Sequence, residues 1–113
     1  MRWVALIFFL SACGGTPAAA PATPEAKALA ECLAAHGVTM YGAFWCPHCA
    51  AQKEVFGDAF AQVTYVECSN PDRTQTQVCI EHKILGYPTW VFPDASRLEG
   101  EQTLAQLKEK SGC

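Results

Sequence analysis

The chain has 113 residues, a length that allows one small domain. Half of its residues are apolar, which is enough for a compact core, and its formal net charge is −3. This charge, and the lack of aromatic residues interleaved with Lys or Arg, argue against nucleic acid and against an anionic surface as partners.

The N-terminus has the features of a secretory signal. The apolar run over residues 3–10 is too short to span a bilayer, but it fits the core of a signal peptide. The next residues, Leu10-Ser11-Ala12-Cys13, resemble the lipobox of bacterial lipoproteins, in which the signal is cut before a cysteine that becomes lipidated. We therefore expect a signal peptide over residues 1–12 and a lipid on Cys13. The protein would be extracytoplasmic and lipid-anchored to a bacterial membrane, at its periplasmic face or on the cell surface. An ordinary secretory signal cleaved near the same place is the alternative.

A segment of low sequence complexity follows the predicted lipidation site. Residues 14–24 are only Gly, Ala, Pro and Thr, so we expect residues 13–24 to be a lipidated cysteine followed by a disordered tether. The folded domain is then predicted over residues 25–113. Its first helix has an N-cap, a first-turn proline and a first-turn acid in Thr23-Pro24-Glu25, and it ends at Gly37.

The next segment contains two cysteines three positions apart. An apolar run over residues 38–44 predicts a strand that leads into Cys46-Pro47-His48-Cys49, and residues 47–56 predict a helix. Two thiols at this spacing can close into a disulfide and reopen, and a helix N-terminus favours a thiolate. The order of strand, Cys-x-x-Cys and helix is typical of thioredoxin-like redox proteins. Half of a zinc site is the alternative, but zinc needs four ligands and a second Cys-x-x-Cys is absent, so we expect no metal.

The rest of the chain alternates short strands and helices. The expected elements are a strand at 63–67, a turn at 69–72, a helix at 74–83, a strand at 89–92, an edge strand at 97–99, and a final helix that a capping box opens at 103 and that ends near 110. The whole order is α-β-α-β-α-β-β-α. It predicts an α/β fold with a small mixed four-stranded sheet and helices on both faces.

Seven cysteines are an odd number, and six remain for the domain if Cys13 is lipidated. This density fits an oxidising compartment. Cys68 and Cys79 have ten residues between them and are candidates for a structural disulfide, with a second redox pair as the alternative. Cys32 and Cys113 would tie the two ends of the domain together, or they would be free or intermolecular thiols.

Three stretches of the sequence resemble a known family. They are Met40-Tyr41-Gly42-Ala43-Phe44-Trp45-Cys46-Pro47-His48-Cys49, Tyr65-Val66-Glu67-Cys68 and Gly86-Tyr87-Pro88-Thr89-Trp90. With these, residues 25–113 resemble the thioredoxin superfamily, and more closely the thioredoxin-like domain found fused to, or beside, vitamin K epoxide reductase family membrane proteins. The resemblance implies a thioredoxin-like fold with Pro88 in cis, facing the cysteine pair. Met40 stands where thioredoxins have a buried Asp that assists proton transfer, which argues against a thioredoxin-style reductase.

The positions of the two thiols suggest separate roles. Cys46, at the helix start, is the expected nucleophile, and Cys49, one turn inward, the resolving thiol. Pro47 and His48 between them tune the redox potential, since a cationic or hydrogen-bonding His48 would stabilise the Cys46 thiolate. The same Pro-His pair occurs in bacterial periplasmic thiol oxidases, which this motif resembles locally. A solvated surface residue is the alternative for His48.

Three residues around the motif are candidates for a substrate groove. They are Trp45, Tyr87 and Thr89, which flank the cysteine pair and Pro88 in the sequence. Core packing is the alternative for the two aromatic residues.

Together, these patterns predict a membrane-tethered enzyme that exchanges disulfides with extracytoplasmic client proteins that have thiols or disulfides. It would act on the oxidising side, with the Cys46–Cys49 disulfide as its redox centre and no added cofactor. The resemblance implies that a quinone-linked, vitamin K epoxide reductase-like membrane protein reoxidises it. The alternatives are a reductase or isomerase fed by a transmembrane electron carrier, and a module in which Cys46, His48 and Cys49 hold copper or zinc for delivery.

Overall fold

The computed structural model describes residues 19–113. The predicted signal peptide over residues 1–12, the lipidation site Cys13 and the first half of the predicted tether lie outside these residues. Within the described part of the chain, no helix is both long enough and apolar enough to cross a membrane.

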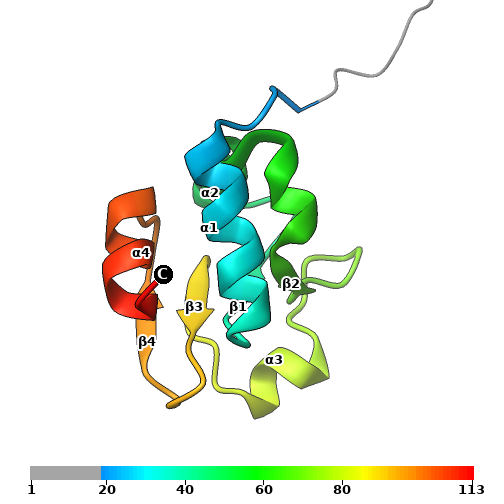
Figure 1. Ribbon diagram of the computed structural model, residues 1–113. Helices are drawn as coiled ribbons and strands as arrows, with labels where there is room; N and C mark the ends of the chain where they lie inside the picture. The colour runs from blue at the N-terminus through cyan, green and yellow to red at the C-terminus, as the bar shows by residue number, and fades with distance from the viewer. Residues whose placement is uncertain (1–18) are drawn as a thin grey trace, which may run out of the picture.

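Short helices and strands alternate along the domain (Figure 1). In chain order they are α1 (Pro24–Ala35), β1 (Thr39–Gly42), α2 (Pro47–Phe56), the 3₁₀ helix η1 (Gly57–Gln62), β2 (Thr64–Glu67), α3 (Gln77–Glu81), β3 (Thr89–Val91), β4 (Arg97–Glu99) and α4 (Leu104–Ser111). The predicted order of elements is confirmed, with η1 as an addition.

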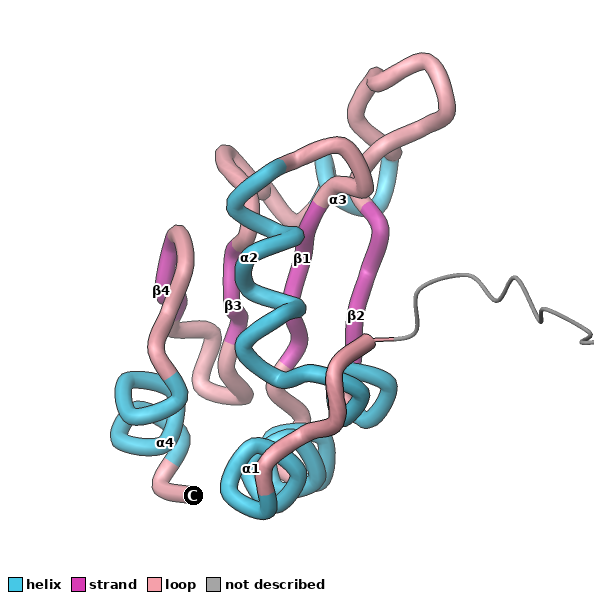
Figure 2. The backbone as a smooth tube through the Cα atoms, turned by 90° about the horizontal axis from the view of Figure 1, so that it is seen from above, coloured by secondary structure: helices cyan, strands magenta, loops and turns pink. Residues whose placement is uncertain are grey.

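The four strands form one mixed sheet in the order β2-β1-β3-β4. β1 pairs with β2 in parallel and with β3 antiparallel, and β3 pairs with β4 antiparallel. Figure 2 shows the strands side by side, with β2 and β4 at the two edges. This arrangement is that of a thioredoxin-like fold, as the sequence predicts.

The two faces of the sheet pack against different helices. Because successive side chains of a strand point to opposite faces, Met40 and Tyr41 separate into two clusters. Met40 belongs to the larger cluster, which also contains residues of α1, α2 and α4, such as Leu33, Phe56 and Leu107. Tyr41 belongs to the smaller cluster with Cys68, Cys79 and Ile84, which lies on the α3 side. The helices therefore cover both faces, with α2 on the larger core.

Two predicted elements are shorter in the structure. The helix expected over residues 74–83 has only five residues, Gln77–Glu81. Thr74 instead belongs to a turn, because its N–H and its hydroxyl both donate to Asp72 Oδ1, at 3.0 and 2.6 Å. The strand expected over residues 38–44 is reduced to Thr39–Gly42, since the carbonyl of Ala43 accepts from the N–H of Cys46 and turns the chain into α2.

The segment before α1 belongs to the folded domain. The carbonyl of Ala20 accepts from the N–H of Asp58 at 2.7 Å, and the N–H of Ala22 donates to Asp58 Oδ1 at 2.8 Å. The tether predicted to reach residue 24 is therefore held against η1 from residue 20 onward. The sequence pattern missed this contact because it joins residues 36 positions apart.

Candidate active site

Cys46 and Cys49 lie at the start of α2, where the chain leaves β1. Cys46 is the N-cap residue, and Pro47 lies in the first turn of the helix. Cys46 is 8% exposed, whereas Cys49 is fully buried, so the outer sulfur is the one that a partner can reach. Both residues are free thiols in the structure. The N-terminus of this ten-residue helix favours negative charge on the Cys46 sulfur.

The loop before β3 approaches Cys46. The Cys46 thiol donates to the carbonyl oxygen of Tyr87, with 3.7 Å between the sulfur and the oxygen. The Tyr87–Pro88 peptide bond is cis, and Pro88 is buried. The carbonyl of Pro88 accepts from the N–H of Gly100 at 2.8 Å, which ties this loop to the end of β4. The structure thus places the Pro88 loop directly beside the outer thiol.

The side chain of His48 pairs with a residue far along the chain. Its Nδ1 lies 2.7 Å from Glu101 Oε1, and the two side chains are 70% and 43% exposed. Glu101 lies between β4 and α4, 53 positions after His48, so the sequence pattern did not indicate it. This contact occupies the Nδ1 side of the ring, so we expect His48 to act on Cys46 through its charge.

Trp45 and Tyr87 form an aromatic edge next to Cys46. Their rings meet edge-on, with 6.0 Å between centroids. The indole N–H of Trp45 donates to Ser69 Oγ at 2.8 Å, which fixes the ring while leaving it 37% exposed. The adjacent Phe44 is 55% exposed. An apolar surface is therefore available beside the outer thiol.

The prediction that Thr89 lines the substrate groove is wrong. Thr89 is 1% exposed, and its hydroxyl donates to the carbonyl of Gly86 at 2.7 Å. Because Thr89 directly follows Pro88, its hydroxyl can hold the loop in place as readily as it can face a substrate. Here Thr89 closes the loop that contains Pro88.

A buried amide holds α2 in place behind the cysteine pair. Gln52 is fully buried and lies on the same face of α2 as Cys49. Its Oε1 accepts from Trp90 Nε1 at 3.2 Å and from the N–H of Gln102 at 2.7 Å, and its Nε2 donates to the carbonyl of Gln102 at 3.0 Å. Gln52 thereby joins α2 to β3 and to the segment before α4. The only sequence signal for it was a polar residue three positions after Cys49, on an otherwise apolar face.

Cys49 lies in an apolar, closely packed environment. Burial raises the pKa of Cys49 to about 11, with contact with the Cys46 thiol adding to the rise, while a backbone hydrogen bond at Ala43 opposes it. A Cβ atom on Gly42 would lie only 3.0 Å from Cys49 Sγ, so glycine is what lets β1 approach the thiol this closely. Met40 on the same strand is fully buried and offers no carboxylate.

A phenol and a carboxylate occupy the neighbouring strand. Tyr65 lies within contact distance of the same Gly42 position, with its ring carbon Cε2 at 3.0 Å and its hydroxyl oxygen at 3.2 Å from that Cβ. The Tyr65 hydroxyl donates to Glu67 Oε1 at 3.1 Å. Burial and the nearby Glu67 raise the pKa of Tyr65, so the phenol stays protonated. Tyr65 and Glu67 are thus polar groups near Cys49, and they come from β2 rather than from position 40 on β1.

The other four cysteines of the described chain form two disulfides. Cys68 and Cys79 are bonded with 5.5 Å between their Cα atoms, and both are fully buried on the α3 side of the sheet. This burial favours the structural interpretation over a second redox pair. Cys32 is bonded to Cys113 across 81 positions, with 6.1 Å between their Cα atoms, which ties α1 to the end of α4.

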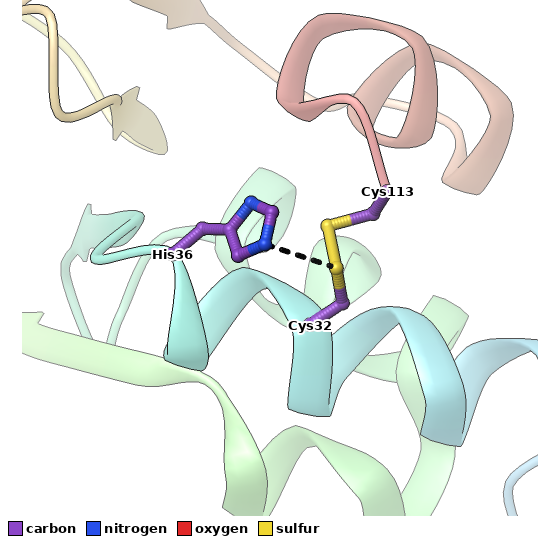
Figure 3. A group of neighbouring side chains, drawn as sticks. All are labelled: Cys32, His36 and Cys113. Carbon is purple, nitrogen blue, oxygen red and sulfur yellow. Dashed lines mark hydrogen bonds between the residues drawn. A yellow bond between two sulfur atoms is a disulfide. The ribbon is translucent and has the colours of Figure 1, made fainter.

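A metal site at Cys46, His48 and Cys49 is not formed in the structure. Among residues 19–113, the His, Cys, Asp and Glu side chains whose ligand atoms converge are Cys32, His36 and Cys113 (Figure 3). Both sulfurs of that group are joined in the disulfide, which leaves one imidazole nitrogen for a metal ion.

The sequence is similar to that of a plant thiol-disulfide oxidoreductase. No protein-family model matches the sequence. The chain is 44% identical over 103 residues to an Arabidopsis thaliana protein named thiol-disulfide oxidoreductase LTO1, and the match covers 86% of this chain. It covers 27% of the relative, so the chain spans about a quarter of the length of the protein it matches.

Proposed function

We propose that this chain, a thioredoxin-like domain homologous to part of a plant thiol-disulfide oxidoreductase, catalyses thiol–disulfide exchange at Cys46 and Cys49. The observation that supports this most directly is the pairing of an outer thiol at a helix N-terminus with a buried thiol one turn inward. The cis Tyr87–Pro88 loop lies against the outer thiol, on the side where a client would approach.

In the oxidising direction, the exchange starts from a Cys46–Cys49 disulfide. A client thiolate attacks Cys46 Sγ, the Cys46–Cys49 bond breaks, and its electron pair leaves on Cys49. The raised pKa of Cys49 means that this sulfur takes up a proton at neutral pH, which disfavours its return. The second client thiol then attacks the client sulfur of the mixed disulfide and releases Cys46. The client is oxidised by two electrons, and the cysteine pair is reduced to two thiols.

The reverse reaction needs a group that removes the Cys49 proton. Met40 cannot do this, and Tyr65, which donates to Glu67, lies close to Cys49. We assign the protein to the oxidising side, because the forward reaction protonates Cys49 and needs no such base. A positive charge on His48, two positions after Cys46, would act in the same sense, since stabilising the reduced form makes a disulfide a stronger oxidant.

The client side of the proposal rests on the surface around Cys46. Phe44 and Trp45 expose apolar surface there, and Tyr87 adjoins it. Such a surface suits apolar segments that surround cysteines in unfolded or partly folded chains. We therefore propose extracytoplasmic proteins with free thiols as clients.

The N-terminal sequence supports the location. The Leu10-Ser11-Ala12-Cys13 motif favours a lipid on Cys13, which would hold the domain at a bacterial membrane and near a quinone-linked, vitamin K epoxide reductase-like protein that reoxidises it. Replacing Cys13 by Ser should release the protein from the membrane fraction while exchange with a dithiol peptide is unchanged. Retention of the Cys13→Ser protein in washed membranes would rule out this anchor.

The activity is tested with two variants of the same pair. Cys46→Ser should abolish oxidation of a dithiol peptide by the oxidised protein. Cys49→Ser cannot form the internal disulfide, so it is mixed with a peptide that contains a disulfide. The Cys46 thiolate should attack this disulfide, one peptide sulfur should leave as a thiol, and the mixed disulfide through Cys46 should appear on non-reducing gels and disappear on reduction. The assigned roles would be contradicted if Cys46→Ser still turned over, or if Cys46→Ser formed mixed disulfides through Cys49.

A further inference from the structure

A second sulfur centre lies between α1 and the end of α4. Cys32 and His36 are one helical turn apart on α1, and Cys113 follows α4 (Figure 3). The Nε2 atom of His36 lies 3.9 Å from Cys32 Sγ, and the two sulfurs and the imidazole are all within 4.8 Å of one another. An imidazole thus stands against one end of a disulfide bond.

This disulfide is accessible, unlike the other one. Cys32 and Cys113 are both partly exposed, whereas Cys68 and Cys79 are fully buried. Cys32 and Cys113 also line a groove of about 520 Å³ between α1 and α4, together with Leu29, Leu104 and Lys108. A thiol in solution can therefore reach the Cys32–Cys113 bond through an open groove.

The position of His36 makes the two ends of the bond different. His36 is the C-cap residue of α1, where the helix dipole favours a cation. Its nearest sulfur is that of Cys32, so negative charge developing on Cys32 is stabilised more than charge on Cys113. We propose that Cys32–Cys113 is a second thiol-exchange site, at which a dithiol attacks Cys113 and His36 stabilises Cys32 as it leaves.

The reaction balances with a dithiol as the reductant. One thiolate of the dithiol attacks Cys113 Sγ, the bond between the two cysteines breaks, and its electron pair passes to Cys32, which takes a proton from the His36 imidazolium. The second thiol of the reductant then attacks the reductant's other sulfur, which is bonded to Cys113 in the mixed disulfide, and releases Cys113. The dithiol becomes a disulfide, and Cys32 and Cys113 become two thiols. The chain would then store two electrons here in addition to two at Cys46 and Cys49.

Several charged groups surround His36 and the groove. Asp94 and Lys110 share a surface hollow with His36, and Glu25 and Lys108 line the groove with the disulfide. The hydroxyl and N–H of Ser96 hold the pKa of Asp94 below its usual range, so this carboxylate stays ionised. Carboxylates and ammonium groups do not ordinarily change charge between about pH 5.5 and about pH 8. Histidine is the side-chain type whose charge ordinarily changes in that interval.

The first experiment uses the full chain with Cys46→Ser and Cys49→Ser, so its outcome does not depend on the function proposed for that pair. Limiting dithiothreitol is added, free thiols are alkylated at intervals, and mass spectrometry identifies them. We expect Cys32 and Cys113 to be alkylated before Cys68 and Cys79, which serve as the internal control. Opening of Cys68–Cys79 first, or of both at one rate, would overturn the proposal.

The second experiment isolates the contribution of His36. In the same background, His36→Gln should slow reduction of Cys32–Cys113 about threefold to fivefold at about pH 5.5, after correction for the thiolate concentration of the reductant. The difference should vanish near pH 8, because imidazoles lose their charge over that range. The control is His82→Gln, at the C-cap of α3, which should leave the rate unchanged. A His36→Gln effect that is absent, or equal at both pH values, would mean that His36 has no part in the exchange.

Discussion

The side chain of Gln52 pairs with both backbone groups of Gln102, accepting from its N–H at 2.7 Å and donating to its carbonyl at 3.0 Å. The same Oε1 atom also accepts from the indole of Trp90 at 3.2 Å. One buried amide thus sets the position of the helix that contains Cys46 and Cys49 relative to β3 and the C-terminal segment.

Replacing Gln52 by Ala should destabilise the protein by about 2–4 kcal/mol, because it leaves the partners of a buried amide unpaired and opens a cavity. Urea denaturation of the oxidised protein measures this loss. The matched control is Gln62→Ala, at the exposed end of η1, which should change stability little. Equal effects of the two substitutions would show that the Gln52 contacts contribute nothing specific.

Replacing Gly42 by Ala should disturb the buried thiol directly. The added Cβ would lie 3.0 Å from both Cys49 Sγ and a ring carbon of Tyr65, so one of them must move. We expect a loss of about 1–3 kcal/mol and a changed rate of attack by client thiols on the Cys46–Cys49 disulfide, in which Cys49 is the leaving sulfur. Gly86→Ala is the control, since its Cβ would meet nothing within 4 Å. Wild-type kinetics of client attack in Gly42→Ala would argue that the packing around Cys49 does not limit exchange.

The raised pKa of Cys49 predicts a late titration in the reduced protein. Below about pH 11 Cys49 remains a thiol, because burial disfavours its charged form, so its thiolate should appear only as the pH approaches 11. Ultraviolet thiolate absorbance measures this, and alkylation near neutral pH should modify Cys46 well before Cys49. Rapid alkylation of Cys49 at neutral pH would contradict the prediction. The Cys46→Ser variant assigns the late step to Cys49.

Removing the His48 side chain should make the Cys46–Cys49 disulfide a weaker oxidant. A cationic imidazole near the outer sulfur stabilises the reduced form, and each 30 mV of this two-electron couple corresponds to about 1.4 kcal/mol. Equilibration of His48→Ala with glutathione buffers measures the potential, and we expect a fall of the order of 30 mV. His82→Ala is the control. An unchanged potential would leave His48 as a surface partner of Glu101.

The features that the sequence predicted well depend on neighbouring residues. The bounds of α2 and β4 agree with the prediction, and Thr103 and Gln106 form the predicted capping box, because a proline in the first turn, a turn motif and a cap act over a few positions. The family resemblance indicated the position of Pro88, which a local pattern alone would not.

The features that the sequence did not predict join distant positions. His48 meets Glu101, and Asp58 holds Ala20 and Ala22, only after the chain has folded. The helix predicted from residue 74 was shortened because Asp72 and Thr74 form a turn of their own. The partner of Cys32 depended in the same way on where α4 ends relative to α1, which no periodicity along the chain determines.

The bond between Cys32 and Cys113 also closes residues 32–113 into a covalent ring. This ring contains the whole sheet and the Cys46–Cys49 pair. A single cleavage of the backbone by a protease within the ring would leave one molecule rather than two fragments, so long as this disulfide remains oxidised. In a compartment that contains proteases, one cut at an exposed loop would then break a peptide bond but leave both parts of the active site in the same molecule.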